Sequence, residues 1–431
     1  MKEHAHSVNS AVSGLTALPG TGLIASATRA MSRFVKHRHI PFHALLEPAQ
    51  DAVREALLSS QSPVALVVHD WCMFGFNTHT SKRDRYQRSH DTDLGYELGT
   101  ALIVDAADGR PLGPMELRLR TAEGMLSTRI GVVEMPPGHI DELLVAMGAA
   151  RLWNINKLPI HVIDREADSV GHYRQWQSRG HRFLVRADQD RLVLWKGREL
   201  KLSRVVGGLS LEFRDVMDAK GQPEIVTIQA GTGRVRVAET KIVLHRPAKQ
   251  TVTGEKTAGG NKKKIDVAGP PIRLRLVVTR VVDENGKVVA EWCLLTNVDS
   301  ETADAATIGR WYAWRWRIET FHKLLKSAGT NAEEWQQETG ARFLRRLCVV
   351  VMACLTVWHL QRDETPEAKR LREILIRLSG RQMKHGVEST APALLAGLEK
   401  LLAIHDILED EYLNKILDLA RKVLPKLFHS G

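Results

Sequence analysis

Two aspartates each close a short apolar run, a position where α/β proteins often place side chains that do chemistry. Residues 64–69 (Val-Ala-Leu-Val-Val-His) predict a buried strand that ends at Asp70. Residues 160–163 (Ile-His-Val-Ile) predict a second buried strand, which ends at Asp164. Because open α/β sheets carry their sites at the carboxyl ends of strands, both carboxylates are candidate site residues.

A third carboxylate, Glu319, lies in an amphipathic segment at residues 310–326. On an α-helix with about 100° between successive residues, one stripe about 80° wide gathers the polar side chains Tyr312, Arg315, Glu319, Lys323 and Lys326. The opposite side carries the apolar residues Trp311, Trp314, Ile318, Phe321 and Leu325. The pattern predicts a single helix that docks on a core by its aromatic side.

Two interpretations fit one carboxylate among these cations. The simpler one is a solvated helix face whose charges pair at helical spacing. In the other, Glu319 holds a divalent metal while the cations beside it hold phosphates, with Tyr312 as a hydroxyl donor and Arg315 as a forked guanidinium donor. The two aspartates at strand ends favour the second interpretation.

The polar stripe also carries a recognisable motif. The spacing Tyr312-x2-Arg315-x3-Glu319-x6-Lys326 resembles the complete Y-R-E-K signature of a family of bacterial insertion-sequence transposases, which are DDE enzymes. The residues through the middle of the helix, Arg-Trp-Arg-Ile-Glu-Thr-Phe-His-Lys, are similar to that family as well.

Further motifs occur in the order that the family shows. Residues 162–168 (Val-Ile-Asp-Arg-Glu-Ala-Asp) look like its second-aspartate motif, and Asp70 matches the first. Residues 292–296 (Trp-Cys-Leu-Leu-Thr) resemble the segment that precedes the signature helix. The resemblance extends over roughly residues 25–360, and four motifs in one order are far more specific than any one of them.

This resemblance implies a ribonuclease-H-like catalytic core and a metal-dependent DNA recombination activity. The expected reaction is cleavage at the terminal inverted repeats of an insertion sequence and joining of the 3′ ends to target DNA, by a cut-and-paste route through a hairpin intermediate. Three carboxylates suit two-metal phosphoryl transfer, and Mg²⁺ prefers such oxygen ligands. We expect Asp70 to bridge two Mg²⁺ ions while Asp164 and Glu319 each help to hold one; Mn²⁺ is an expected substitute.

The resemblance also implies roles in DNA binding. In the family, the Tyr, Arg and Lys of the signature contact phosphates near the cleaved end, which here are Tyr312, Arg315 and Lys326. A tryptophan of the preceding strand stacks on a base that is flipped out in the hairpin, which here is Trp292. From the helical stripe, Lys323 is added as a DNA-binding candidate. Trp316 is a second candidate for stacking on the flipped base. The simpler interpretation of Trp292 is that its side chain packs in the core.

Two features of the motifs leave questions open. Glu166 and Asp168 lie so close to Asp164 that either could be the metal ligand instead, although only Asp164 stands at the strand end. Trp71 and Cys72 follow Asp70, where the family commonly has small or hydroxyl residues, so the local packing there is in question.

The order of patterns along the chain predicts an α/β fold with a mixed-sheet core interrupted by a β-rich insertion. A reduced helical DNA-recognition region is expected at residues 1–60, with helices at 27–35 and 49–58. The core is expected at 61–181 and is completed by the catalytic helix at 301–332. The insertion occupies 182–300, with a mobile basic loop at 247–271, and a helical region fills 333–431.

Composition narrows the class of protein. Sixty-one Lys and Arg against fifty Asp and Glu give a net charge of +11 in 431 residues, which favours a polyanionic partner. The four cysteines form no C-x-x-C pair, which argues against a zinc ribbon or a disulfide scaffold. No phosphate-binding loop of the G-x4-G-K-[ST] type is present, so ATP dependence is not indicated.

The composition predicts an intracellular protein, and the resemblance implies a bacterial one that is cytoplasmic and associated with the nucleoid when it binds DNA. The longest apolar run, residues 347–360, is too short to span a membrane and predicts a buried helix. By the resemblance, partners are double-stranded terminal repeats and target DNA, and two copies pair in the synaptic complex. Only about 69 residues precede Asp70, fewer than in full-length relatives, so a truncated copy is also considered. The alternatives are a catalytically silent transposition inhibitor and a non-transposing nuclease.

Overall fold

The computed structural model describes residues 33–409, except residues 35, 38, 89–91, 137, 154–155, 229, 257–261, 327–329 and 385–386. The side chains of residues 251–256, 262 and 402–409 also lie outside the description. The helix expected at residues 27–35 falls almost entirely outside the described residues. The helix expected at 49–58 is longer than predicted and forms α3 (Phe42–Ser59).

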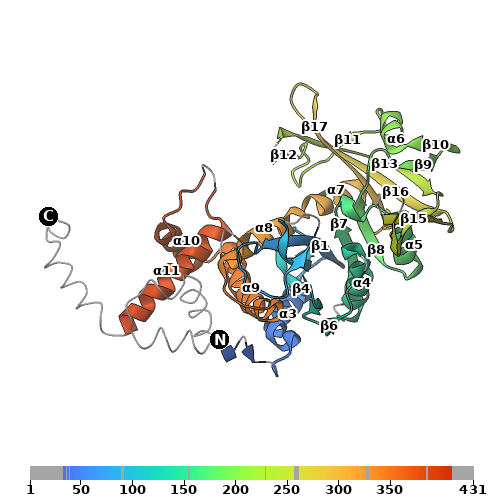
Figure 1. Cartoon of the computed structure of the whole chain (residues 1–431). Coiled ribbons are helices and arrows are strands. Elements are labelled where there is room, and N and C mark those ends of the chain that lie inside the picture. The colour runs from blue at the N-terminus through green and yellow to red at the C-terminus, as the bar shows by residue number, and fades with distance from the viewer. Residues whose placement is uncertain are drawn as a thin grey trace.

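Among the described residues, one mixed sheet of 15 strands forms the frame of the molecule (Figure 1). Its first part consists of β1 (Val64–Gly75), β2 (Tyr86–Gln87), β3 (Leu94–Asp105), β4 (Pro111–Thr121), β5 (Gly124–Ser127), β6 (Gly131–Val133), β7 (Leu158–Ile163) and β8 (Arg182–Arg186). The main path of the sheet runs β10-β9-β13-β16-β17-β8-β7-β1-β3-β4-β5-β6.

The centre of this sheet has the strand directions expected of the predicted core. β1, β3 and β4 form an antiparallel meander, and β7 and β8 then run parallel to β1. Three consecutive antiparallel strands followed by two parallel ones are compatible with a ribonuclease-H-like fold. The parallel register pairs His69 with Ile163, so Asp70 and Asp164, which follow them, lie level on neighbouring strands.

The prediction that the first strand ends at Asp70 is wrong. β1 continues to Gly75, and Asp70 lies in its middle, paired with Thr100 of β3. A polar residue after an apolar run resembles a strand end in sequence, but β1 pairs with β3 along its whole length, as far as Gly75 opposite Gly95. Cross-strand hydrogen bonds therefore carry the strand past the carboxylate.

Helices cover both faces of the central sheet (Figure 1). One face, which includes Leu66 and Val68, packs against residues of α8 (Trp316–Leu325) and α9 (Gly340–Arg362) in the largest buried cluster. On the other face lie η1 (His139–Glu142), α4 (Leu143–Leu152), η2 (Arg165–Ala167) and α5 (Val170–Ser178). Because side chains alternate along a strand, Asp70 faces α8 and Trp71 faces η1 and α4.

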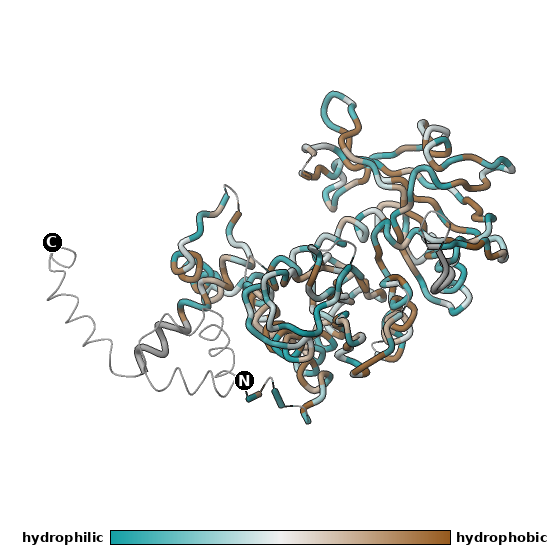
Figure 2. The backbone as a smooth tube through the Cα atoms, in the orientation of Figure 1, coloured by the Kyte–Doolittle hydropathy of each residue, from teal (hydrophilic) through white to brown (hydrophobic). Residues whose placement is uncertain are grey.

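The β-rich segment after β8 extends the same sheet. It consists of β9 (Leu192–Trp195), β10 (Arg198–Lys201), α6 (Leu202–Gly208), β11 (Arg214–Asp215), β12 (Ile225–Ile228), β13 (Gly231–Leu244), β16 (Ile272–Val282) and β17 (Val288–Thr296). Hydrophilic and hydrophobic stretches alternate along these strands (Figure 2). The expected loop at residues 247–271 is instead a hairpin of β14 (Ala248–Lys256) and β15 (Lys262–Val267). Arg174 of α5 holds both its ends, by donating to the carbonyls of Arg246 and Pro270.

The segment at residues 310–326 is not one continuous helix. It forms the end of α7 (Ala305–Ala313) and the whole of α8, and Lys326 follows the last helical residue. Between the helices, the amide of Arg315 donates to the Tyr312 carbonyl three residues back, and the amides of Arg317 and Ile318 repeat this spacing. Such tighter bonds turn the chain by a different angle per residue than an α-helix. The expected aromatic side nevertheless packs inward, and Trp311, Ile318, Phe321 and Leu325 are buried.

The chain after α8 is helical, as expected. It contains η3 (Ala332–Glu334), α9, α10 (Pro366–Ser379) and α11 (Ala391–Glu409). The 23-residue α9 is long and apolar enough to cross a membrane by length and composition, so the apolar helix is longer than the sequence run suggested. About two-thirds of the most apolar stretch of α9 is buried inside the structure, as in the core helix of a globular protein.

A buried histidine fixes α8 on the sheet and makes folding sensitive to acid. His322 Nε2 lies 3.1 Å from Thr100 Oγ1, and burial lowers the His322 pKa to about 3. The unfolded chain takes up this proton near pH 6.5, so stability attributable to His322 is lost as the pH falls from 6.5 towards 3. Between about pH 7.5 and about pH 5, we expect the free energy of unfolding of the wild-type chain to fall by about 2 kcal/mol more than that of His322→Gln. Urea unfolding at both pH values measures this difference; equal losses would contradict it.

Candidate active site

The three predicted carboxylates meet around the guanidinium of one buried arginine. Arg315, only 4% exposed, lies 2.9 Å from Glu319 Oε1, 3.5 Å from Asp164 Oδ2 and 3.6 Å from Asp70 Oδ2. Asp70 comes from the middle of β1, Asp164 from the end of β7, and Glu319 from the first turn of α8. The fold therefore brings together three acids that are about 250 residues apart at the extremes of the sequence.

Two further side chains surround Asp164. The hydroxyl of Tyr312 donates to Asp164 Oδ1 at 3.0 Å, and Arg186 Nη1 lies 3.9 Å from the same oxygen. Tyr312 is buried, whereas Arg186 is about one-third exposed. Sequence reasoning missed Arg186, although it ends β8, the parallel neighbour of β7. The strand-end argument that identified Asp164 applies equally to the last residue of that strand.

The surroundings push the pKa values of the two aspartates apart. Burial raises the pKa of Asp70 to about 6, against the opposing effects of the Trp71 amide and Arg315, and the nearby charges of Glu319 and Asp164 raise it further. Burial acts in the same direction on Asp164. There, Arg315, the Arg165 amide and Tyr312 together outweigh it and lower the pKa of Asp164. Asp164 is thus the more strongly ionised of the pair.

The two other acids near Asp164 have different partners. Glu166 Oε2 lies 2.9 Å from His139 Nε2, on the sheet face opposite Asp70. Asp168 accepts from the Tyr173 hydroxyl, the Arg191 side chain and the Asp188 amide. Of the three acids that the sequence left open, Asp164 is the one that the structure places beside Arg315 and Glu319.

The remaining DNA-binding candidates occupy different positions around the carboxylates. Lys326 Nζ donates to the Met73 carbonyl at 2.7 Å and lies 3.2 Å from Glu333, so it sits beside β1. Lys323 of α8 is exposed. Trp316 is 51% exposed, and its ring lies 5.3 Å from the Arg315 guanidinium carbon. Trp292 on β17 is half-buried and packs against the main core.

The donor set fits divalent metal ions by its chemistry and its access to solvent. The side chains of Asp70, Asp164 and Glu319 are 25%, 34% and 28% exposed, so ions from solvent can reach all three carboxylates. Hard cations such as Mg²⁺ prefer carboxylate oxygens. In this arrangement the guanidinium of Arg315 lies between the three carboxylates, and among the described residues no three Asp, Glu, His or Cys side chains are close enough together to hold one metal ion. Metal binding at these acids therefore requires the Arg315 side chain to withdraw.

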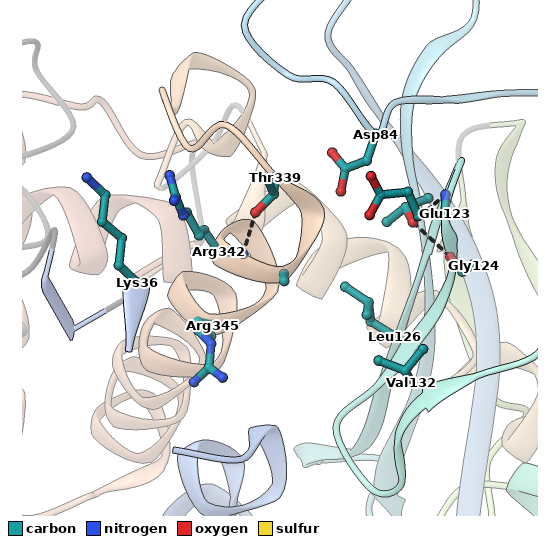
Figure 3. Close-up of a pocket in the computed structure, with 11 residues that line it drawn as sticks. Lys36, Asp84, Glu123, Gly124, Leu126, Val132, Thr339, Arg342 and Arg345 are labelled. Carbon is teal, nitrogen blue, oxygen red and sulfur yellow. Dashed lines mark hydrogen bonds between the residues drawn. The ribbon is translucent and has the colours of Figure 1, made fainter. Parts of the chain in front are cut away.

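A separate cavity of about 330 Å³ lies between the β4–β5 hairpin and the start of α9 (Figure 3). Its lining includes Glu123, Leu126, Arg342 and Arg345 and none of the three carboxylates above. Asp84, on the same wall, is already bonded to the Gly340 amide and the Tyr96 hydroxyl. These contacts indicate a structural junction, and the candidate active site is the carboxylate cluster.

Comparison with known families identifies a domain that spans much of this site. A family model described as "Transposase DDE domain" matches residues 140–356, about half of the chain. The matched segment contains Asp164 and Glu319, together with Tyr312, Arg315 and Lys326, while Asp70 precedes it. The chain is therefore a member of the transposase family defined by this DDE domain.

Proposed function

We propose that this chain is an active transposase that cuts DNA at the terminal inverted repeats of an insertion sequence and joins the 3′ ends to target DNA. The observation that carries the proposal is the meeting of Asp70, Asp164 and Glu319 around Arg315 in a member of a transposase family. The bacterial source implied by the Y-R-E-K signature, and the cut-and-paste route, belong to this proposal.

Asp70, Asp164 and Glu319 are proposed to be the residues that would hold two Mg²⁺ ions. The chemistry that such ions would supply is activation of an attacking oxygen and stabilisation of a leaving oxygen on phosphorus. The chain's own residues then have three tasks: the acids fix the ions, Tyr312 orients Asp164, and Arg315 becomes available to phosphate oxygens. Lys323 and Lys326 are proposed to contact the DNA backbone near the cut.

Incubation of the full chain with Mg²⁺, DNA carrying the element's own terminal repeats and a supercoiled target tests the function. The expected products are 3′-end cleavage followed by strand transfer into the target. Cutting without joining would indicate a nuclease, and binding without cutting would indicate a transposition inhibitor; either result contradicts the proposal. Two copies of the chain are proposed to hold two ends, which the size of the assembled complex measures.

Trp292 is proposed to stack on a base that is extruded during hairpin formation. Stacking of one base on an aromatic ring contributes about 1–3 kcal/mol, so Trp292→Ala should slow hairpin formation by roughly 5-fold to 150-fold. The measurement uses pre-nicked terminal DNA, on which hairpin formation is separated from the first cut. Trp292→Phe, which keeps a stacking ring, should recover most of the rate.

The exposed Trp316 provides the comparison for this experiment, because it is the second candidate for the same role. Trp316→Ala should leave hairpin formation close to that of the wild type. Normal hairpins from Trp292→Ala, or a loss confined to Trp316→Ala, would remove the stacking role from Trp292.

A further inference from the structure

The sheet face opposite Asp70 carries a compact cluster of polar side chains around His139. Trp71, the residue after Asp70, packs its ring on the His139 imidazole with 4.5 Å between centroids and 33° between planes. The indole Nε1 of Trp71 donates to Glu142 Oε2 at 3.4 Å. The residue that looked out of place after the first aspartate therefore has a specific partner on η1.

The same histidine also reaches the second aspartate's loop. His139 Nε2 lies 2.9 Å from Glu166 Oε2, and Glu166 stands in η2 two residues after Asp164. The imidazole of His139 thus contacts both Trp71, which follows Asp70 in β1, and Glu166, which lies two residues after Asp164. On the same face, a buried hydrogen bond between His69 and His161, with 2.9 Å between Nε2 and Nδ1, joins β1 to β7 nearer the middle of the sheet.

Buried ion pairs hold η1 in place beneath this contact. Glu142 lies 2.5 Å from Arg120 and 3.4 Å from Arg118, and Arg118 also donates to the Glu142 carbonyl at 3.0 Å. His139 Nδ1 lies 3.8 Å from the buried Glu97. Since Arg118 and Arg120 belong to β4 and Glu97 to β3, the position of His139 is fixed by strands that carry no catalytic carboxylate.

A glycine permits the approach of Trp71 to Glu142. A Cβ atom at Gly99 would lie 3.0 Å from Trp71 Nε1 and 3.2 Å from Glu142 Oε2, closer than ordinary contacts. Gly99 is the cross-strand partner of Trp71. A side chain at this position would therefore push the indole away from η1 without removing any polar group.

We propose that His139 is a positioning residue, which joins Trp71 to Glu166 and so adjusts the separation of Asp70 and Asp164 within the limits that the β1–β7 pairing sets. The inference rests on the proposed function, in which these two acids hold metal ions together. Residues that would hold metal ions together must stay within about 0.5 Å of their working positions. Residues that orient metal ligands from behind typically change metal affinity or activity by 10-fold to 100-fold when they are replaced.

The first test compares His139→Ala with the wild-type full chain. The apparent Kd for Mn²⁺, measured by calorimetry without DNA, should rise by about 10-fold or more, and the rate of DNA cleavage at saturating DNA should fall by about 10-fold to 100-fold. The affinity for terminal DNA, and therefore KM, should change by less than about 2-fold, because His139 lies on the face away from α8 and its cations. Gly99→Ala should weaken Mn²⁺ binding in the same direction.

The second test separates orientation of Asp164 from direct metal binding by Glu166. The Glu166 side chain is 58% exposed, so its replacement should leave the fold intact. Glu166→Ala should behave like His139→Ala, whereas Glu166→Gln, which can still accept from His139 Nε2, should recover near-wild-type Mn²⁺ affinity and cleavage. If Glu166→Gln is as defective as Asp164→Asn, Glu166 is a metal ligand and the inference is wrong.

A nearby pair supplies the matched control. His172 Nε2 lies 3.0 Å from Asp141 Oδ1, with burial similar to that of His139, but it joins η1 to α5 and contacts neither Trp71 nor Glu166 in the described hydrogen bonds. His172→Ala should retain wild-type Mn²⁺ binding. Unchanged Mn²⁺ affinity in His139→Ala would overturn the inference. A wild-type chain that binds Mn²⁺ but never cuts DNA would contradict the proposed function alone, and the binding comparison would still decide the role of His139.

Discussion

Replacing Glu319 with Gln is expected to lower DNA cleavage in Mg²⁺ by on the order of 10³-fold while DNA binding changes little. A metal ion lowers the energy of the charge that develops at phosphorus by several kcal/mol. The amide of Gln is a much weaker metal ligand than a carboxylate. The fold should persist, because the Gln oxygen can still accept from Arg315, which now donates to Glu319 at 2.9 Å. Cleavage of labelled terminal DNA and a gel-shift measurement give the two quantities.

Glu338 offers a control with an ion pair of the same residue types and spacing. It forms an ion pair with Arg342 four residues away, as Glu319 does with Arg315, but it lies just before α9 and its side chain is 60% exposed. Glu338→Gln should cleave at the wild-type rate. Full cleavage by Glu319→Gln with Mg²⁺ or Mn²⁺ would remove Glu319 from the proposed metal site, and equal losses in both variants would point to a general effect of removing a charge.

Some residues of this site can be predicted from local sequence patterns, whereas others depend on how distant strands pair. Asp164 follows directly from the strand pattern, because the apolar run and the strand end at the same place. Asp70 required more than pattern: its strand runs on to Gly75, and only the parallel pairing of His69 with Ile163 sets it beside Asp164. Register between distant strands is a tertiary property, so local patterns do not encode it.

Three of the five residues in the predicted helical stripe lie together in the structure, but the sequence did not show what surrounds them. A helical wheel gathers Tyr312, Arg315 and Glu319 on one side, and the structure keeps them together across the turn between α7 and α8. The wheel does not reveal what that side faces. It faces Asp70 and Asp164, so Tyr312 and Arg315 are buried against carboxylates rather than presented on an open surface.

Composition misled the prediction at residues 247–271. Lysine, glycine and threonine are common in flexible loops, yet the segment forms the β14–β15 hairpin. The reason lies outside the segment, because Arg174 of α5 bonds to carbonyls at both of its ends. These contacts come from a helix more than 70 residues earlier in the chain. The composition of residues 247–271 alone therefore cannot predict them.

Replacing Arg315 with Met is expected to destabilise the chain by about 2–3 kcal/mol in buffer that contains a chelator. Removal of one partner from a buried ion pair typically costs about 3–5 kcal/mol, and here partial exposure of the three acids reduces the effect. The Met side chain fills much of the same space, so the loss reflects repulsion among Asp70, Asp164 and Glu319 more than a cavity. Urea unfolding of the wild type and the variant gives the difference in free energy of unfolding.

Addition of Mg²⁺ tests whether the loss of stability in Arg315→Met comes from the carboxylate cluster. Because a ligand that binds only the folded state stabilises it, and because Arg315 no longer lies between the acids, Mg²⁺ should stabilise Arg315→Met more than the wild type. Arg317→Met is the matched control, since Arg317 lies two residues away in the first turn of α8 and donates to the Gly109 carbonyl instead. If Arg315→Met is as stable as the wild type, or if Mg²⁺ stabilises all three proteins equally, Arg315 does not offset the charges of the three acids.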